Sequence, residues 1–217
     1  MNIAQLVFNP IRENTYLIWD ATNECVVIDA GNSSKEENQA LENFIEQKGL
    51  KPTLAINTHG HFDHLLGVSF LCEKYGIPFA MHKDDSYLLS SIKPGESIYG
   101  IEIGVTPQSI DIDLSQRDSI TFGETTLKII PTPGHTPGHV SLFEEQSGVL
   151  FTGDTIFRES IGRTDLPGGD YPALMNSIIE NILPLGDEIK IYPGHAESTT
   201  IGHESLYNPF IVEQINK

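Results

Sequence analysis

The feature that most constrains this chain is the segment from Thr58 to His64, which reads Thr-His-Gly-His-Phe-Asp-His. It follows the apolar run Leu54 to Ile56, which indicates a short buried strand. Imidazole and carboxylate groups are common ligands of zinc and similar divalent metals. On an extended backbone His59 and His61 point to one side, while the aspartate and the last histidine turn away if a helix begins there. One loop can therefore supply ligands to two adjacent metal positions.

Three later segments also place histidine or aspartate directly after strand-like runs. In residues 131–139, Pro-Thr-Pro-Gly-His-Thr-Pro-Gly-His, the density of proline and glycine excludes a regular element. Asp154 follows an apolar strand in Phe-Thr-Gly-Asp-Thr, and His195 ends Tyr-Pro-Gly-His. Each segment alone is a weak signal, since an aspartate in such a position is commonly a turn residue. Together, the candidate ligands suit two metals that share one carboxylate.

The length and composition predict one globular domain over residues 1–217. A chain of 217 residues can form one sizeable core, and 39% hydrophobic with 20% charged residues is typical of globular proteins. The 13 basic and 30 acidic residues give a net charge of −17. Nucleic acids and anionic membranes bind clustered Lys and Arg, so we expect neither as a partner.

The two cysteines and the N-terminus indicate the cellular setting. Cys25 and Cys72 cannot form a disulfide framework, and we expect both to be reduced and buried. The N-terminus has no basic segment followed by an apolar one, and no apolar run approaches transmembrane length. We therefore expect a cytoplasmic protein, a monomer or small homo-oligomer, that acts on a small molecule.

The hydrophobic pattern predicts a mixed α and β fold. Helices are predicted from Ser33 or Ser34 to Lys48 and at residues 64–75, 83–91, 171–183 and 199–207. Residues 92–113 show no clear period and are either a substrate-facing lid or a plain surface loop. Strands are predicted at residues 3–8, 14–20, 25–29, 53–57, 77–81, 118–122, 125–130, 140–144, 148–152 and 189–192. The two runs of strands and helices suggest two facing sheets with helices outside.

The motifs resemble those of metallo-β-lactamase-fold hydrolases, through Thr58 to His64 and the later order His135, Asp154, His195. Within that superfamily, residues 132–139, 152–157 and 193–195 resemble the glyoxalase II group, the hydroxyacylglutathione hydrolases. Residues 162–165 and 207–210 resemble the short, single-domain members of this group. The resemblance implies a four-layer αββα sandwich of the α/β class. It also implies a metal-dependent hydrolase of a thioester, either S-lactoylglutathione or a related hydroxyacyl thioester.

The resemblance also implies the site residues. It implies two divalent metal ions, zinc first, with iron and manganese also compatible with such ligands. Asp63 would orient the attacking hydroxide or accept a proton, and His139 would orient a ligand. The implied ligands are His59, His61 and His135 for one ion, Asp63, His64 and His195 for the other, and Asp154 as a bridge.

The identity of the thiol is left open by the sequence. Arg163 falls where glyoxalase II enzymes have a basic residue near the substrate, although a salt bridge with Asp165 or Asp170 is equally compatible. Two-domain glyoxalase II enzymes bind glutathione through a C-terminal extension that is not expected here. Glu197 stands where those enzymes carry a tyrosine. Coenzyme A, bacillithiol or another carrier therefore fits as well as glutathione.

Two other activities are compatible with the same motifs. Sulfur dioxygenases of this fold act on persulfides with a single iron, which His59, His135 and Asp154 would hold. Those enzymes tend to carry alanine at the position of Gly194, which favours the hydrolase. A non-enzymatic metal-binding protein is the other alternative, and an open site would argue against it. A β-lactamase is disfavoured because Asp154 stands where the common di-zinc lactamases place a cysteine.

Overall fold

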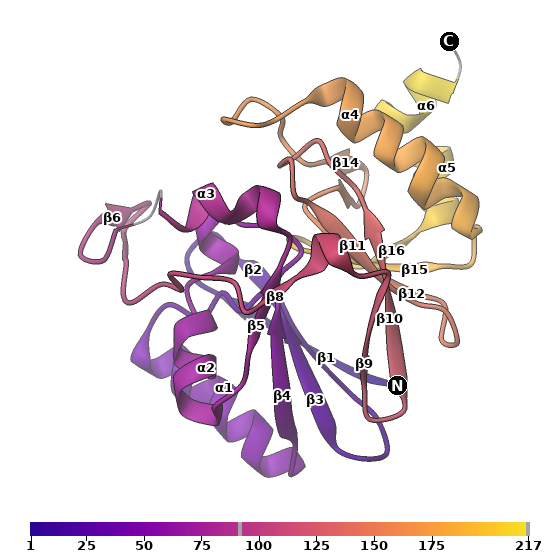
Figure 1. Ribbon diagram of the computed structural model, residues 1–217. Helices are drawn as coiled ribbons and strands as arrows, with labels where there is room; N and C mark the ends of the chain where they lie inside the picture. Colours follow the sequence, from indigo (N-terminus) through magenta and orange to yellow (C-terminus); the bar gives the residue numbers. More distant parts are fainter. Residues whose placement is uncertain (91–92, 216–217) are drawn as a thin grey trace.

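A computed structural model describes residues 1–90 and 93–215, and its main feature is a pair of six-stranded sheets that face each other (Figure 1). In the first sheet, β1, β2 and β3 are antiparallel, whereas β3, β4, β5 and β8 are parallel. Its order is β1 (Asn2–Phe8), β2 (Glu13–Trp19), β3 (Glu24–Ile28), β4 (Lys51–Ile56), β5 (Phe79–Met81) and β8 (Ile112–Asp113).

The second sheet is largely antiparallel, with one parallel pair, β12 and β15. Strands β10 and β12 are both antiparallel to β11, so β10, β12 and β15 end at the same edge of the sheet. Its order is β16 (Thr199–Thr200), β15 (Lys190–Pro193), β12 (Val149–Gly153), β11 (Val140–Glu144), β10 (Thr125–Pro131) and β9 (Ser119–Phe122).

Helices cover the outer face of each sheet, as Figure 1 shows. Helices α1 (Lys35–Lys48) and α2 (Val68–Tyr75) lie against the first sheet. The second sheet is covered by α4 (Tyr171–Asn176), its π-helical continuation Ser177–Ile182, α5 (Ile201–Tyr207) and α6 (Pro209–Ile215). The shorter elements are α3 (Ser86–Leu89), the hairpins β6 (Ser97–Ile98) with β7 (Ile101–Glu102) and β13 (Ile156–Phe157) with β14 (Ser160–Ile161), and the 3-10 turns Phe62–His64, Lys83–Asp85, Leu114–Gln116 and Leu183–Leu185.

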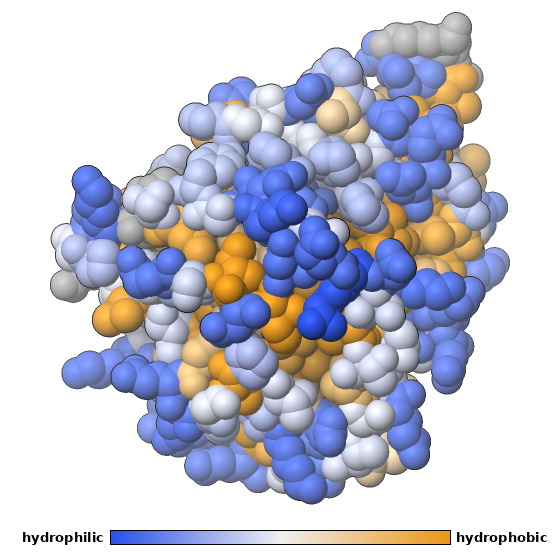
Figure 2. Space-filling view, in the orientation of Figure 1, coloured by the Kyte–Doolittle hydropathy of each residue, from blue (hydrophilic) through white to orange (hydrophobic). Residues whose placement is uncertain are grey.

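Three apolar layers follow from the alternation of side chains along the strands. On β2, Leu17 packs toward the helices of the first half, whereas Tyr16 and Ile18 pack into the space between the sheets. A third layer, which includes Phe143 and Leu174, lies between the second sheet and its helices. Figure 2 shows hydrophobic groups between the two halves, framed by hydrophilic residues. The order helix, sheet, sheet, helix confirms the predicted four-layer arrangement.

Several predicted element bounds are wrong because tertiary contacts override local pattern. The predicted helix 64–75 starts only at Val68, since Leu65 to Gly67 turn so that the Gly67 N–H donates to Ala30 O at 2.7 Å. The strand 77–81 begins only at Phe79, after a proline that cannot donate to the sheet. Helix 83–91 becomes a 3-10 turn followed by α3, and its last residue, Ser91, lies outside the described residues.

Other departures concern elements that the pattern did not resolve. Helix 171–183 changes to π-helical geometry at Ser177, and the pattern missed α6. Residues 93–113 contain β6, β7 and β8, the last of which completes the first sheet, and Ile92 lies outside the described residues.

The cysteines and the helix lengths test two further expectations. Cys25 is buried, but the expectation is wrong for Cys72, which only partly packs against the core from α2. Among the described residues, no helix is both long and apolar enough to span a membrane.

Candidate metal centre

The predicted ligands gather where strand ends from the two sheets meet. The loop after β4 carries His59 and His61, and His135, Asp154 and His195 follow β10, β12 and β15. The Val140 N–H donates to Thr58 O at 2.9 Å, and the Asn14 N–H donates to Gly194 O at 2.8 Å, so hydrogen bonds join the two edges. Ligands placed at strand ends are held by the sheets, which gives the site a defined geometry.

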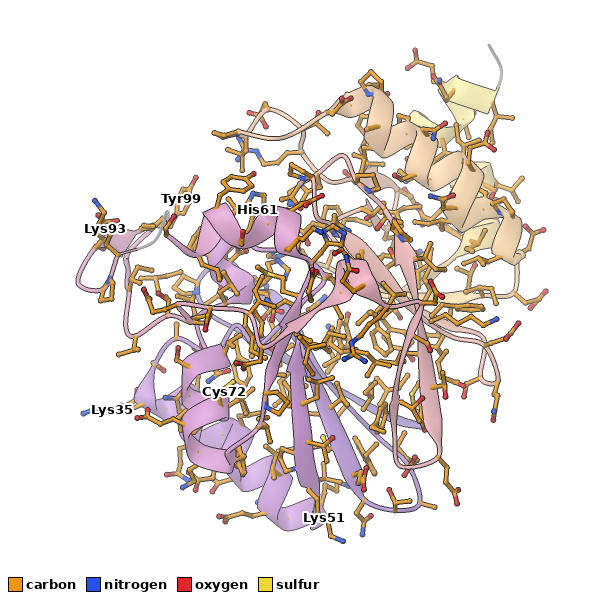
Figure 3. The ribbon with its side chains drawn as sticks, viewed as in Figure 1. Lys35, Lys51, His61, Cys72, Lys93 and Tyr99 are labelled. Carbon is orange, nitrogen blue, oxygen red and sulfur yellow. The ribbon has the colours of Figure 1, made fainter. Side chains whose placement is uncertain are left out.

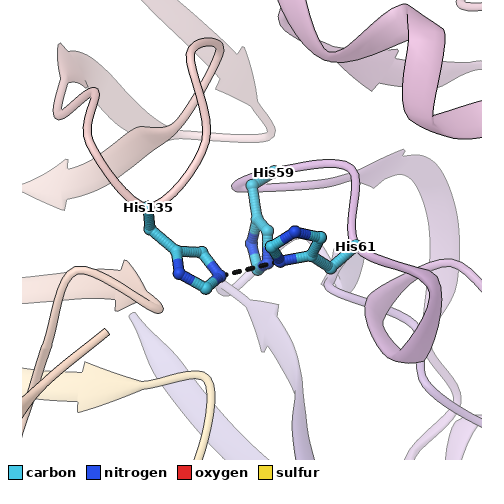
Figure 4. A group of neighbouring side chains, drawn as sticks. All are labelled: His59, His61 and His135. Carbon is cyan, nitrogen blue, oxygen red and sulfur yellow. Dashed lines mark hydrogen bonds between the residues drawn. The ribbon is translucent and has the colours of Figure 1, made fainter. Parts of the chain in front are cut away.

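One group of ligand atoms comes from His59, His61 and His135, whose candidate atoms all lie within 4.8 Å of one another (Figure 4). His61 Nδ1 and His135 Nε2 are 2.8 Å apart. His135 Nδ1 lies 2.7 Å from the carbonyl oxygen of Arg163, which can only accept. His135 therefore donates through Nδ1 and directs the lone pair of Nε2 into the group.

A second group comes from Asp63, His64 and His195, again within 4.8 Å of one another. His195 Nε2 is 3.2 Å from Asp63 Oδ2, and His64 Nε2 is 3.7 Å from the same oxygen. The 3-10 turn Phe62–His64 makes this possible, because it turns Asp63 and His64 away from the direction of His59 and His61.

Asp154 lies between the two groups. Its Oδ1 is 3.5 Å from His64 Nε2 of the second group. Its Oδ2 is 3.6 Å from both His135 Nε2 of the first group and His195 Nε2 of the second. One carboxylate thus contacts both groups, which is the arrangement that a bridging ligand requires.

The donor set fits divalent metal ions. His59 Nε2, His64 Nε2 and Asp154 Oδ1 are buried and have no hydrogen-bond partner. Leaving a buried polar atom unpaired costs about 1–3 kcal/mol, which coordination to a cation would remove. The fold therefore carries clusters of histidine and aspartate that are suited to binding metal ions.

Burial and neighbouring charges set the protonation of these groups. Burial and the surrounding histidines lower the pKa of His59 well below its ordinary value and lower the pKa of His61 to about 4. Both imidazoles are therefore neutral near pH 7, the form that coordinates a metal. Burial also disfavours charge on His64, but Asp154 and Asp63 outweigh it and raise its pKa. Burial alone would raise the pKa of Asp154, whereas His64, His195 and His135 lower it.

His139 supports the loop that carries Asp154. Its buried ring accepts a hydrogen bond from the Asp154 N–H at Nε2, at 3.1 Å. Its Nδ1 lies 2.9 Å from the hydroxyl of Thr132 and 3.2 Å from that of Thr155. These contacts support the prediction that His139 orients a ligand, and both ring nitrogens are occupied away from the ligand groups.

Asp29 is an orienting residue that the motif analysis missed. Its carboxylate accepts hydrogen bonds from the Thr58 N–H at 2.7 Å and the Thr58 hydroxyl at 2.8 Å, and it lies 3.3 Å from His64 Nδ1. Asp29, His59 and His64 form a third group of candidate atoms, but both Asp29 oxygens already accept hydrogen bonds. The signal was its position at the end of the predicted strand 25–29.

Asp85 was also missed, and it joins the two histidine loops. Its side chain is fully buried, and one oxygen accepts from the Gly60 N–H at 2.9 Å and the Thr136 hydroxyl at 2.6 Å. The other oxygen accepts from the Gly138 N–H at 2.7 Å. Gly60 separates His59 from His61, so this carboxylate ties the first histidine loop to the loop that carries His135.

Arg163 forms the expected salt bridge with Asp165, and its role in substrate binding stays a prediction. Its guanidinium donates two hydrogen bonds to Asp165, each at 2.7 Å, whereas Asp170 instead caps α4 by accepting from the Ala173 N–H at 3.0 Å. Arg163 also lines the cavity beside the ligands. An ion pair with Asp165 and a place at the substrate site are therefore compatible.

A cavity of about 560 Å³ opens onto both ligand groups. The size suits a small-molecule substrate. Its lining residues are Pro10, Ile11, His61, Phe62, Asp63, Tyr99, His135, Asp154, Arg163, Leu166 and His195.

Comparisons with known proteins agree with this geometry. Residues 9–195 match the model of the Metallo-beta-lactamase superfamily. The chain is 35% identical to the hydroxyacylglutathione hydrolase GloC of Haemophilus influenzae, over 97% of this chain and 98% of that protein. The structure of the BLEG-1 B3 metallo-beta-lactamase has a TM-score of 0.88 at 35% identity, and covers 97% of this chain and 99% of its own. TTHA1623 in a di-iron-bound form has a TM-score of 0.83 at 32% identity, over 95% and 99%.

Proposed function

Because this chain belongs to the metallo-β-lactamase superfamily of metal-dependent hydrolases, we propose that it cleaves a thioester of a small hydroxy acid. The observation that carries the proposal is the pair of ligand groups that share Asp154 beside one cavity. The similarity to the GloC hydrolase supports the thioester as substrate class and makes S-lactoylglutathione the first compound to test.

The proposed centre holds two metal ions. His59, His61 and His135 would hold one ion, Asp63, His64 and His195 the other, and Asp154 would bridge them. Zinc is the first candidate, and the di-iron form of TTHA1623 supports iron as the second. Ions at this centre would lower the pKa of a water molecule and polarise the substrate carbonyl.

Asp63 is the proposed catalytic carboxylate. Burial would raise its pKa, but His64 and the hydrogen bond from His195 lower it below the ordinary value. Asp63 therefore stays ionised near neutral pH and can orient the attacking water through an accepted hydrogen bond. Attack on the carbonyl carbon breaks the carbon–sulfur bond, and the sulfur leaves as a thiolate, whose ordinary pKa of roughly 8.5 makes it a good leaving group.

Gly194 favours the hydrolase over the single-iron dioxygenase. A Cβ atom at this position would lie 2.3 Å from Asp154 Oδ1 and 2.7 Å from His64 Cε1. Alanine would therefore displace the shared carboxylate and one ligand of the second group. Glycine leaves room for both groups, as a dinuclear centre requires. The adjoining cavity likewise favours an enzyme over a protein that only binds metal.

The test is hydrolysis of S-lactoylglutathione by purified protein whose bound metals have been counted. We expect turnover with two metals per chain, and loss of both turnover and metal in the Asp154→Ala variant. Lack of turnover on glutathione, coenzyme A, N-acetylcysteamine and apolar aromatic thioesters, with two metals bound, would refute a thioesterase. A single bound iron with oxygen uptake on glutathione persulfide would instead support the dioxygenase.

Hydrolysis of a β-lactam is a second candidate. The likeness to BLEG-1, described as a B3 metallo-beta-lactamase, extends over 97% of this chain. The same oriented water could attack the strained amide carbonyl of a β-lactam in this cavity. A chromogenic cephalosporin tested beside the thioesters distinguishes the two, because we expect kcat/KM for the thioester to be the larger.

A further inference from the structure

Two aromatic side chains from distant segments form one wall of the cavity beside the metal ligands. Phe62 lies between two proposed ligands, His61 and Asp63, and Tyr99 comes from the tip of the β6–β7 hairpin. Their rings stack with centroids 6.3 Å apart and planes 19° apart. Tyr99 is nevertheless 74% exposed, so most of its ring is free to contact a ligand. Figure 3 labels Tyr99 and His61 on the same upper side of the molecule.

The hairpin turn holds Tyr99 in an unfavourable backbone conformation. Ile98 pairs with Ile101, so Tyr99 and Gly100 form a two-residue turn, and both have positive φ angles of 51° and 79°. Such turns favour Asn, Asp or Gly at these positions, and a tyrosine there is uncommon. Backbone strain of this kind concentrates at ligand-binding positions. The Tyr99 ring lines the cavity, and because it is so exposed it does not pack into the hydrophobic core.

The charge around this wall is low. Ile11, Leu166 and Pro10 extend the apolar surface. Apart from the histidines of the ligand groups, Arg163 is the one basic side chain among the described residues that line the cavity. Asp165 already pairs with that guanidinium through two hydrogen bonds. Away from the proposed metal ions, a ligand with several carboxylate or phosphate groups would thus find one guanidinium in the cavity lining, and would have to compete with Asp165 for it.

We propose that Phe62 and Tyr99, with Ile11 and Leu166 beside them, bind an apolar group of about the size of an aromatic ring in a substrate that carries at most one anionic group. The substrate class is then an apolar thioester, rather than one with several anionic groups, such as a glutathione conjugate with its two carboxylates or a coenzyme A conjugate with its phosphates. This inference rests on the proposed thioesterase function. The apolar group belongs to the thiol half or to the acyl half, and the test separates the two.

The hydrolytic test compares four thioesters on the metal-loaded protein. Two lack an aromatic group, S-lactoylglutathione and S-lactoyl-N-acetylcysteamine, and two carry a benzyl group, S-benzyl 2-hydroxypropanethioate and S-phenyllactoyl-N-acetylcysteamine. We expect kcat/KM for at least one of the two benzyl compounds to exceed that for both compounds without an aromatic group by about tenfold. Tyr99→Ala should lower this value about three- to tenfold, mainly through KM, which is the range expected for losing an aromatic contact. Tyr99→Phe should retain the wild-type kcat/KM, because it keeps the aromatic ring. A preference for the glutathione conjugate would overturn the proposal.

The matched control is Tyr207→Ala, which removes another tyrosine, 63% exposed, from α5. Equal effects of the two alanine variants on the benzyl substrate would contradict a binding role for Tyr99. A binding role would also be contradicted if Tyr99→Ala lowered kcat/KM equally for the benzyl substrates and for the substrates without an aromatic group.

A binding experiment keeps this inference separate from the proposed function. Calorimetry on the protein as purified, with its metals bound, would use two thioethers that cannot be hydrolysed, 1-(benzylsulfanyl)propan-2-ol and S-(2-hydroxypropyl)glutathione. We expect the benzyl thioether to bind more tightly, and Tyr99→Ala to weaken it about three- to tenfold. Tighter binding of the glutathione thioether would refute the inference even if the protein hydrolyses thioesters. Failure to hydrolyse any thioester, with the benzyl preference intact, would refute only the proposed function.

Discussion

Replacement of Asp85 tests whether one buried carboxylate holds the two histidine loops together. In Asp85→Ala, the Gly60 N–H, the Gly138 N–H and the Thr136 hydroxyl all lose their acceptor within the protein interior. Each buried donor left unpaired costs about 1–3 kcal/mol, so we expect the three together to cost roughly 3–9 kcal/mol in the free energy of unfolding. That is a large fraction of the roughly 5–15 kcal/mol typical of a folded domain.

Asp85→Asn gives a graded version of the same test. The amide keeps one oxygen acceptor and puts an NH₂ group in place of the other oxygen. The Thr136 hydroxyl can rotate to accept from this group, but whichever backbone N–H faces it loses its partner. We therefore expect a loss of about 1–3 kcal/mol, and a variant that still folds if the alanine variant does not.

The assay is urea unfolding of the metal-free protein, followed by chelator competition to measure metal affinity. Asp84→Ala is the matched control, because this neighbouring aspartate has a side chain that is 54% exposed. We expect metal affinity to fall in both Asp85 variants, since His59, His61 and His135 lie on the loops that Asp85 joins. If both Asp85 variants had free energies of unfolding within about 0.5 kcal/mol of wild type, as ordinary surface substitutions do, the reasoning would be refuted.

Three further predictions concern the bridge, the glycine beside it and a remote carboxylate. Asp154→Ala should reduce bound metal below two per chain and abolish most turnover; two retained metals with full activity would contradict its shared position. Gly194→Ala should lower metal content by crowding Asp154, whereas Gly104→Ala, with no atom within 4 Å of its added Cβ, should not. Burial opposes ionisation of Asp20, but hydrogen bonds from Thr22, Glu124 and Thr125 lower its pKa to about 2 from 3.8. Its contribution to stability is therefore present above pH 4 and lost as pH falls toward 2. Asp20→Asn should cost about 1–2 kcal/mol at pH 7 and flatten the pH dependence of urea unfolding between about pH 4 and 2.

The candidate metal-binding groups at strand ends were predictable because their signals are local. A buried strand, the break that follows it and a histidine or aspartate in that break all lie within a few consecutive residues, as in Leu54 to His61. Strand and helix periodicity predicted a mixed α and β fold and suggested two facing sheets, and the resemblance to a known family implied the four layers that the structure shows.

The sequence by itself thus determined which residue types are available for a metal centre, and in which order along the chain they follow the strands. Only the tertiary structure decided that Asp85 would meet Thr136, 51 residues away, and that Asp29 would meet Thr58, 29 residues away. It also brought Tyr99 onto Phe62 in the wall of the cavity. The physical reason is that such contacts depend on how distant segments pack, and packing leaves no periodic signal in the residues that take part.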